Sequence, residues 1–107
     1  MNPTFLKILR LVESGAVRIS DHADKKIVED ELSVRQLVQS AKNGIVIEDY
    51  PTFPKGPCVL VLQPDGEGRP IHVIWGIPKG FEGPVVLVTA YRPDSELWEH
   101  GFMRRKR

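Results

Sequence analysis

The chain has 107 residues, of which 41% are hydrophobic and 27% charged, and its formal net charge is +1. This length and composition predict one soluble globular domain that can bury a core without metal or disulfide staples. An internal disulfide is excluded because Cys58 is the only cysteine. No run of about 18 apolar residues predicts a membrane span. We therefore expect a reduced, buried thiol, no membrane association and a cytoplasmic location.

Basic residues gather at the end of the chain, where Arg104, Arg105, Lys106 and Arg107 are consecutive. The rest of the chain is acidic on balance, so a polyanion would meet these four residues first. We predict a single α+β domain over residues 1–103 and a basic RNA-binding tail over residues 104–107. The ordinary alternative for such a tail is a solvated end without a partner.

The first 44 residues have apolar residues at helical spacing, with a capping signal before each stretch. Helices are expected from residue 3 to Gly15, over residues 22–32, and from residue 34 to Gly44. Their capping signals are Asn2 with Pro3, Ser20 with Asp21, and Ser33 with Gln36. Between the first two helices, residues 16–20 (AVRIS) predict a short strand or an extended bridge.

From Ile45 onward the apolar residues alternate, which predicts strands over residues 45–50, 58–63, 71–77 and 85–91. The connectors are short and rich in Gly and Pro, so neighbouring strands should form antiparallel hairpins. We predict an α+β fold in which N-terminal helices cover one face of a four-stranded antiparallel β-meander. Residues 93–102 should form a turn or short C-terminal helix whose Trp98 and Phe102 partly cover the other face.

Two of these strands carry polar groups among apolar residues. His72 stands between Ile71 and Val73, whereas Thr89, Tyr91 and Arg92 end the last strand. An imidazole, two hydroxyls and a guanidinium on adjacent strands suit a phosphate-directed site. The ordinary alternative for a lone strand histidine is a hydrogen-bonded structural role.

Three motifs, ISDHADKK, RPIHVIWG and VVLVTAYRPDSELW, occur in this order and together resemble the bacterial domain of unknown function 4258. Domains of this kind are similar in layout to small ribonuclease toxins of the RelE and barnase type. The resemblance implies helices on one face of an antiparallel sheet, RNA cleavage on the other face, and a neutralising antitoxin protein as partner. Lys25 and Lys26 replace the arginine that commonly follows the histidine, which keeps the charge but loses the bidentate fork.

RNA cleavage without a metal needs a base near the ribose 2′-hydroxyl, an acid near the leaving oxygen, and cations around the phosphorane. We predict His22 as the base, because a helix N-terminus disfavours the charged imidazole, and His72 as its partner. The ordinary alternative for His22 is a hydrogen bond to neighbouring backbone.

The other predicted site residues either stabilise charge or contact the nucleic acid. Tyr91 would donate a proton or stack on an unpaired base, and Thr89 would orient the reacting groups. Lys26 and Arg92 would stabilise charge at the phosphorane, and Lys25 would join the basic tail in binding RNA.

The sequence is compatible with three classes of function. The first is a toxin-like, RNA-directed endoribonuclease that acts without a metal. The second is a non-catalytic RNA- or protein-binding module of the same fold, and the third is a small-molecule or structural domain. No metal site is predicted because the three histidines and one cysteine lack a short ligand spacing. No cofactor is predicted either, since the Gly-rich stretches fall in hairpin turns, and the oligomeric state is not indicated.

Overall fold

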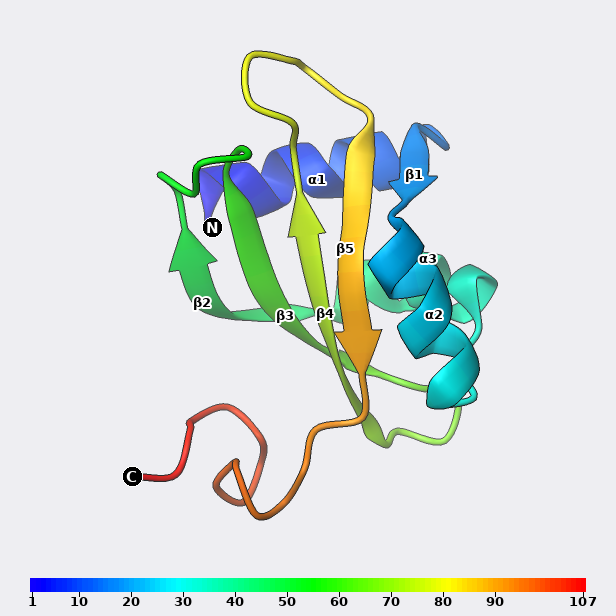
Figure 1. Cartoon of the computed structure of the whole chain (residues 1–107), viewed down its shortest axis with the longest axis vertical. Helices are drawn as coiled ribbons and strands as arrows, with labels where there is room; N and C mark the ends of the chain where they lie inside the picture. The colour runs from blue at the N-terminus through cyan, green and yellow to red at the C-terminus, as the bar shows by residue number, and fades with distance from the viewer.

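All the helices precede Ile45, and four of the five strands begin at or after it, as the two periodicities predict (Figure 1). The computed structural model describes all 107 residues. Its elements in chain order are α1 (Pro3–Glu13), β1 (Val17–Ile19), α2 (Asp21–Glu29), α3 (Val34–Ser40), the 3-10 helix η1 (Ala41–Asn43), β2 (Ile45–Tyr50), β3 (Cys58–Pro64), β4 (Pro70–Gly76) and β5 (Val85–Tyr91). No helix is long and apolar enough to cross a membrane.

All three predicted N-caps are confirmed by side-chain hydrogen bonds. Asn2 accepts from the amide of the third residue after it, and Ser20 and Ser33 do the same. Each bond satisfies one of the free amides at a helix start. The second helix is shorter than predicted, because Glu31 adopts a left-handed backbone (φ 55°) and the amide of Leu32 bonds back to the carbonyl of Ile27.

The sheet has five strands in the order β1-β5-β4-β3-β2. The antiparallel pairing of β2 with β3, β3 with β4, and β4 with β5 confirms the predicted meander. The prediction of a purely antiparallel, four-stranded sheet was wrong, because β1 pairs in parallel with β5 through Val17, Arg18 and Ile19. A three-residue strand gives a weak periodic signal, and its partner lies almost 70 residues further along the chain.

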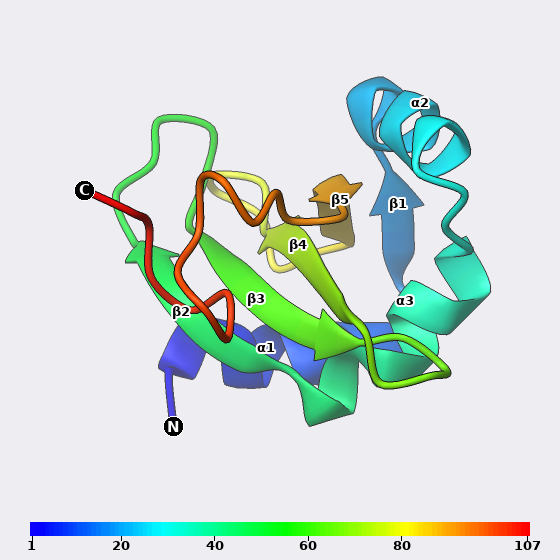
Figure 2. The same ribbon diagram turned by 90° about the horizontal axis from the view of Figure 1, so that it is seen from below.

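The core lies between one sheet face and the helices α1 and α3. Ile8, Leu37, Val73 and Trp75 are completely buried there. The prediction that all three helices lie on this face was wrong for α2. In Figure 2, α1 and α3 lie on one side of the sheet, while α2 stands on the other side, beside β5. Ala23 and Ile27 of α2 still join the core from the sheet edge.

The C-terminal segment after β5 contains no helix, so of the predicted turn or short helix the turn is confirmed and the helix was wrong. Asp94 begins a single turn, in which its carbonyl accepts from the amides of Leu97 and Trp98. Gly101 (φ 92°) and Phe102 (φ 60°) then reverse the chain. The prediction that Trp98 packs back on the body is confirmed, because only 3% of this residue is exposed.

Candidate functional site

The face of the sheet opposite α1 and α3 is the surface that positions the predicted site residues. Cross-strand register aligns its side chains in three rows. The rows are Leu62, His72 and Tyr91; Leu60, Ile74 and Thr89; and Cys58, Gly76 and Val86. We call this surface the open face. It therefore carries three of the predicted catalytic residues on neighbouring strands.

A cavity of about 440 Å³, which we call the hollow, lies on the open face. Two cations, Arg18 and Lys55, and two half-exposed aromatic rings, Tyr50 and Phe53, line it. The other lining residues are mostly small or apolar: Ser20, Gly56, Cys58, Ile74, Gly76, Ile77, Pro78, Val86 and Val88. Burial raises the pKa of the Cys58 thiol, which keeps it protonated at neutral pH. The hollow thus combines an apolar floor with cationic and aromatic sides.

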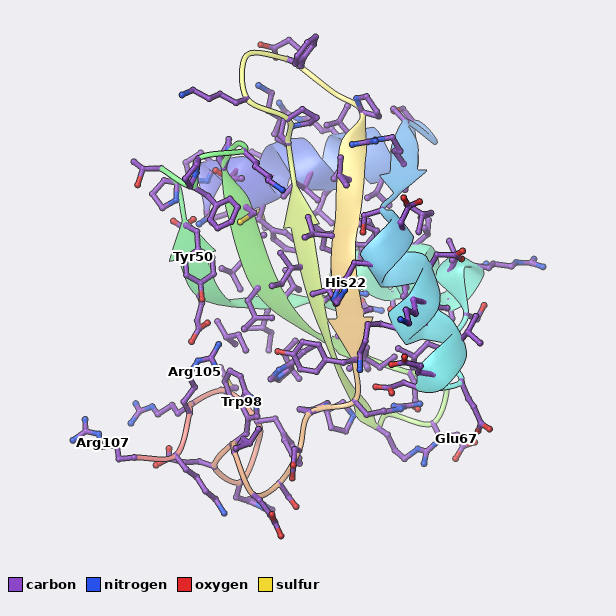
Figure 3. All side chains as sticks on the ribbon, viewed as in Figure 1. His22, Tyr50, Glu67, Trp98, Arg105 and Arg107 are labelled. Carbon is purple, nitrogen blue, oxygen red and sulfur yellow. The ribbon has the colours of Figure 1, made fainter.

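The amino end of α2 is fixed beside the hollow by its capping residue. The Ser20 hydroxyl donates to the Val88 carbonyl (2.8 Å) and accepts from the Ala23 amide (3.0 Å). His22 follows in the first turn, is exposed, and projects in front of β5 (Figure 3). This is the side of the sheet away from α1, so His22 and His72 belong to the same side of the sheet.

His72 is completely buried, and both of its ring nitrogens have partners. Nε2 lies 2.8 Å from the Phe102 carbonyl, which can only accept, so this nitrogen carries the proton. Nδ1 then accepts from the Tyr91 hydroxyl at 3.3 Å. The Trp98 ring packs edge-on at 4.4 Å between centroids. Burial lowers the pKa of His72, although the Phe102 hydrogen bond opposes this, so His72 is neutral and covered.

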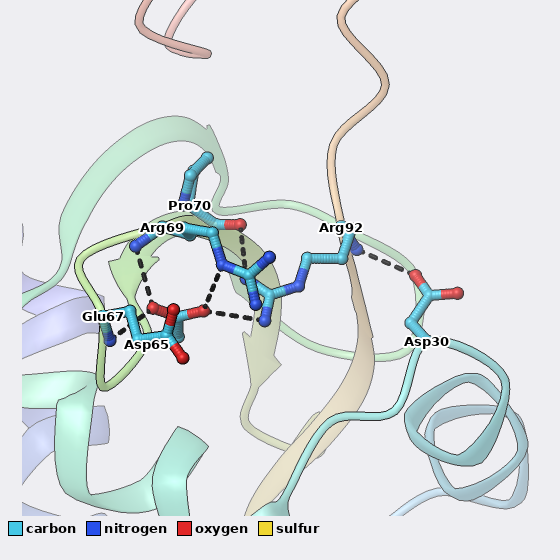
Figure 4. Close-up of polar contacts among 6 residues, drawn as sticks. All are labelled: Asp30, Asp65, Glu67, Arg69, Pro70 and Arg92. Atoms are coloured by element: carbon cyan, nitrogen blue, oxygen red, sulfur yellow. Dashed lines mark hydrogen bonds and ion pairs between the residues drawn. The ribbon is translucent and has the colours of Figure 1, made fainter.

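Arg92 belongs to a network that ties the end of β5 to the turn between β3 and β4 (Figure 4). Its guanidinium lies 2.8 Å from the Asp65 carboxylate and donates to the Pro70 carbonyl at 3.2 Å. Burial alone would raise the pKa of Asp65, but amide hydrogen bonds from Arg69 and Glu67, together with Arg92, lower it to about 2. The fork of Arg92 is therefore already occupied by protein groups.

Lys26 is also paired with carboxylates. Its ammonium lies 3.4 Å from Glu29 and 3.9 Å from Asp30. Asp30 in turn accepts from the backbone amide of Arg92 at 2.8 Å. The structure thus brings the Lys26 ammonium and the backbone amide of Arg92 to Asp30, and His72 to Tyr91. His22 lies apart from these contacts, and Thr89 is one row away from His72 and Tyr91.

The predicted basic tail is not uniformly free. Arg105 forms two hydrogen bonds with Glu48, at 2.9 and 3.0 Å, and its guanidinium lies 4.6 Å from the centre of the Trp98 ring. These hydrogen bonds lower the pKa of Glu48, which also accepts from the Tyr50 hydroxyl. The remaining predicted RNA-binding cations are exposed: Lys25, Arg104, Lys106 and Arg107.

Sequence reasoning missed the residues that line the hollow. Arg18 lies on the strand β1, whose partner was not recognised, and Phe53 and Lys55 lie in the connector between β2 and β3. An aromatic residue and a lysine in a Pro- and Gly-rich connector were the available signal, because exposed aromatic residues in loops are typical of binding surfaces.

Fold and site together define a small α+β domain with one partly uncovered sheet face. Residues 19–92 match the family model described as Domain of unknown function (DUF4258), and the chain belongs to this family. A search of the curated proteins and a search of the solved structures found no match to the chain.

Proposed function

We propose that this protein binds single-stranded RNA on its open face, with an unpaired base in the hollow and the flanking phosphates at Arg18 and Lys55. The hollow is the observation that carries this proposal, because aromatic and apolar surface stacks bases while neighbouring cations hold the backbone. Neither Arg18 nor Lys55 forms an ion pair with a carboxylate, in contrast to Lys26 and Arg92. Both cations are therefore available to a phosphate.

The size and shape of the hollow favour single strands over duplexes. Its volume of about 440 Å³ lies within the range of roughly 300–1,000 Å³ that is usual for small-ligand sites. A paired base stays stacked inside its helix and cannot enter such a site, whereas an unpaired base can be turned out into it.

The test compares the binding of a labelled single-stranded RNA to Arg18→Gln and Lys55→Gln at several salt concentrations. Each variant should weaken binding and reduce the slope of log K against log salt by about 0.7, the value for one lost phosphate contact on a single strand. Lys42→Gln removes another exposed charge, in η1 and outside the hollow, and should leave the slope unchanged. The proposal would be contradicted if Lys42→Gln weakened RNA binding as much as the other two variants do. It would also be contradicted if the unchanged protein bound duplex RNA as tightly as single-stranded RNA.

A second candidate function is cleavage of the bound RNA without a metal, with His22 as the proton-transferring residue. The exposed position of His22 in the first turn of α2, beside the hollow, favours this candidate. One uncovered face on a sheet backed by helices also supports the proposed likeness to RelE- and barnase-type ribonuclease toxins. A toxin of this kind would have a neutralising antitoxin protein as its partner.

Cleavage is tested by incubating end-labelled RNA with the protein, with and without EDTA. If His22 transfers a proton, His22→Ala should slow cleavage about 10²–10⁴-fold, while RNA affinity and thermal stability stay unchanged. His100→Ala removes another exposed histidine and should cleave at the normal rate. RNA that stays intact with the unchanged protein would contradict cleavage and leave the binding proposal standing.

A further inference from the structure

The chain after β5 crosses the open face and covers part of it. We call residues 94–107 the strap (Figures 1 and 2). Its Trp98 ring packs on His72, and its Phe102 carbonyl accepts a hydrogen bond from Nε2 of His72. Without the strap, the row that contains His72 and Tyr91 would lose its cover, because α1 and α3 pack on the other side of these strands and α2 stands at the edge, beside β5.

Arg105 holds the far part of the strap to the body. Its guanidinium bonds Glu48 of β2 and lies against Trp98, so one side chain joins the sheet edge to the ring that covers His72. We call the pair of Arg105 and Glu48 the latch. Figure 3 shows Arg105 and Trp98 next to each other, with Tyr50 above them.

The strap also has backbone hydrogen bonds of its own. The amide of Lys106 donates to the Leu97 carbonyl, and the amide of Glu99 donates to the Arg104 carbonyl. These bonds close a hairpin-like turn within the strap, so they can persist when the strap leaves the sheet. The Arg105 side of the latch is open to water, since 60% of the Arg105 side chain is exposed against 25% of the Glu48 side chain, so salt screens the pair and an external anion can reach the guanidinium.

We propose that the strap is a releasable cover, and that an RNA backbone lifts it by replacing Glu48 at Arg105. A guanidinium binds a phosphate with the same two-pronged geometry that it uses for a carboxylate. Release uncovers His72 beside Tyr91 and adds a second imidazole to the open face. This inference rests on the proposed function, since RNA is the anion that makes the exchange.

One residue connects the hollow to the latch, which links RNA binding to release. Tyr50 lines the hollow, and its hydroxyl donates to Glu48. A base that stacks on Tyr50 brings its flanking phosphate toward the carboxylate that holds Arg105. Repulsion between this phosphate and Glu48 favours the transfer of Arg105 to the phosphate.

The latch is tested first without RNA, by the rate at which diethyl pyrocarbonate modifies each histidine. In Arg105→Gln, the rate at His72 should rise about tenfold, because an ion pair and a cation–π contact are both lost. Arg107→Gln removes an exposed tail charge and serves as the matched control. His22 and His100 give the reference rates within each sample.

Glu48→Gln provides a second variant in which the amide oxygen can still accept from Tyr50. The rate at His72 should rise in Glu48→Gln as it does in Arg105→Gln. The thermal melting curve should stay unchanged, because the sheet and helices do not depend on the latch. A rate at His72 equal to that of Arg107→Gln in both variants would overturn the proposal that the latch holds the strap.

RNA-driven release is measured with a single-stranded 2′-O-methyl oligonucleotide, which lacks the attacking hydroxyl. Acrylamide quenching reports on Trp98, because Trp75 is completely buried in the core. Quenching should rise on binding in the unchanged protein and stay constant in Arg105→Gln, whose strap is already free. Oligonucleotide binding without a rise in quenching would overturn the proposal that RNA releases the strap. If the protein does not bind the oligonucleotide, both the proposed function and RNA-driven release are contradicted. The modification rates of His72 in Arg105→Gln and Glu48→Gln, measured without RNA, still show whether the latch holds the strap.

Discussion

Replacing Gln63 with alanine should lower the free energy of unfolding by about 4 kcal/mol, the largest effect expected of any single polar residue in this chain. Gln63 is completely buried on the core face of β3. Its Oε1 accepts from the Trp75 indole at 2.7 Å, and its Nε2 donates to the Leu37 carbonyl at 2.9 Å and the Ser40 hydroxyl at 2.8 Å. Alanine leaves these partners without a bond and opens a cavity between sheet and helix.

Urea unfolding followed by circular dichroism measures this loss. Gln39→Ala removes an exposed glutamine from the same helix that Gln63 contacts, and its effect should stay within about 0.5 kcal/mol. Gln63→Leu fills most of the volume but leaves the Trp75 indole unpaired. Its free energy of unfolding should therefore lie between those of Gln63→Ala and Gln39→Ala. A loss below about 1 kcal/mol in Gln63→Ala would show that water replaces the amide.

Features encoded by neighbouring residues were predictable from the sequence. The three N-caps bond to amides three residues away, and the four meander strands are joined by short connectors. Local backbone chemistry decides such features, so a single sequence contains their signal. The parallel strand β1 has no local signal of this kind, because its pairing with β5 is decided by tertiary packing.

Residue types in the candidate site were predictable, but their partners were not. Arg92 has the chemistry of a phosphate ligand, yet Asp65 from a distant turn occupies its fork. His72 has the chemistry of an acid or base, yet Phe102 and Tyr91 bond both nitrogens, as in the ordinary alternative for a strand histidine. The hollow was not predicted at all, because its lining comes from separate segments that only the folded sheet brings together.

Replacing Asp65 with asparagine should destabilise the protein at neutral pH and flatten its stability profile in acid. The folded-state pKa of Asp65, about 2, lies below the ordinary value of 3.8. A lowered pKa means that the ionised carboxylate contributes stability fully above the ordinary value, and that this contribution is lost as pH falls toward about 2. Urea midpoints measured from pH 7 down to pH 2 should therefore decline more in the unchanged protein than in Asp65→Asn.

Two further variants separate this network from an RNA-binding role for Arg92. Glu67→Gln changes an exposed carboxylate in the same turn and should leave the acid profile unchanged. Arg92→Lys keeps the charge but cannot span both the Asp65 carboxylate and the Pro70 carbonyl, so it should lower the urea midpoint at neutral pH. RNA affinity should stay constant in Arg92→Lys, because its fork serves the fold. A variant that keeps full stability but loses RNA affinity would instead assign Arg92 to the phosphate, as the sequence alone predicts.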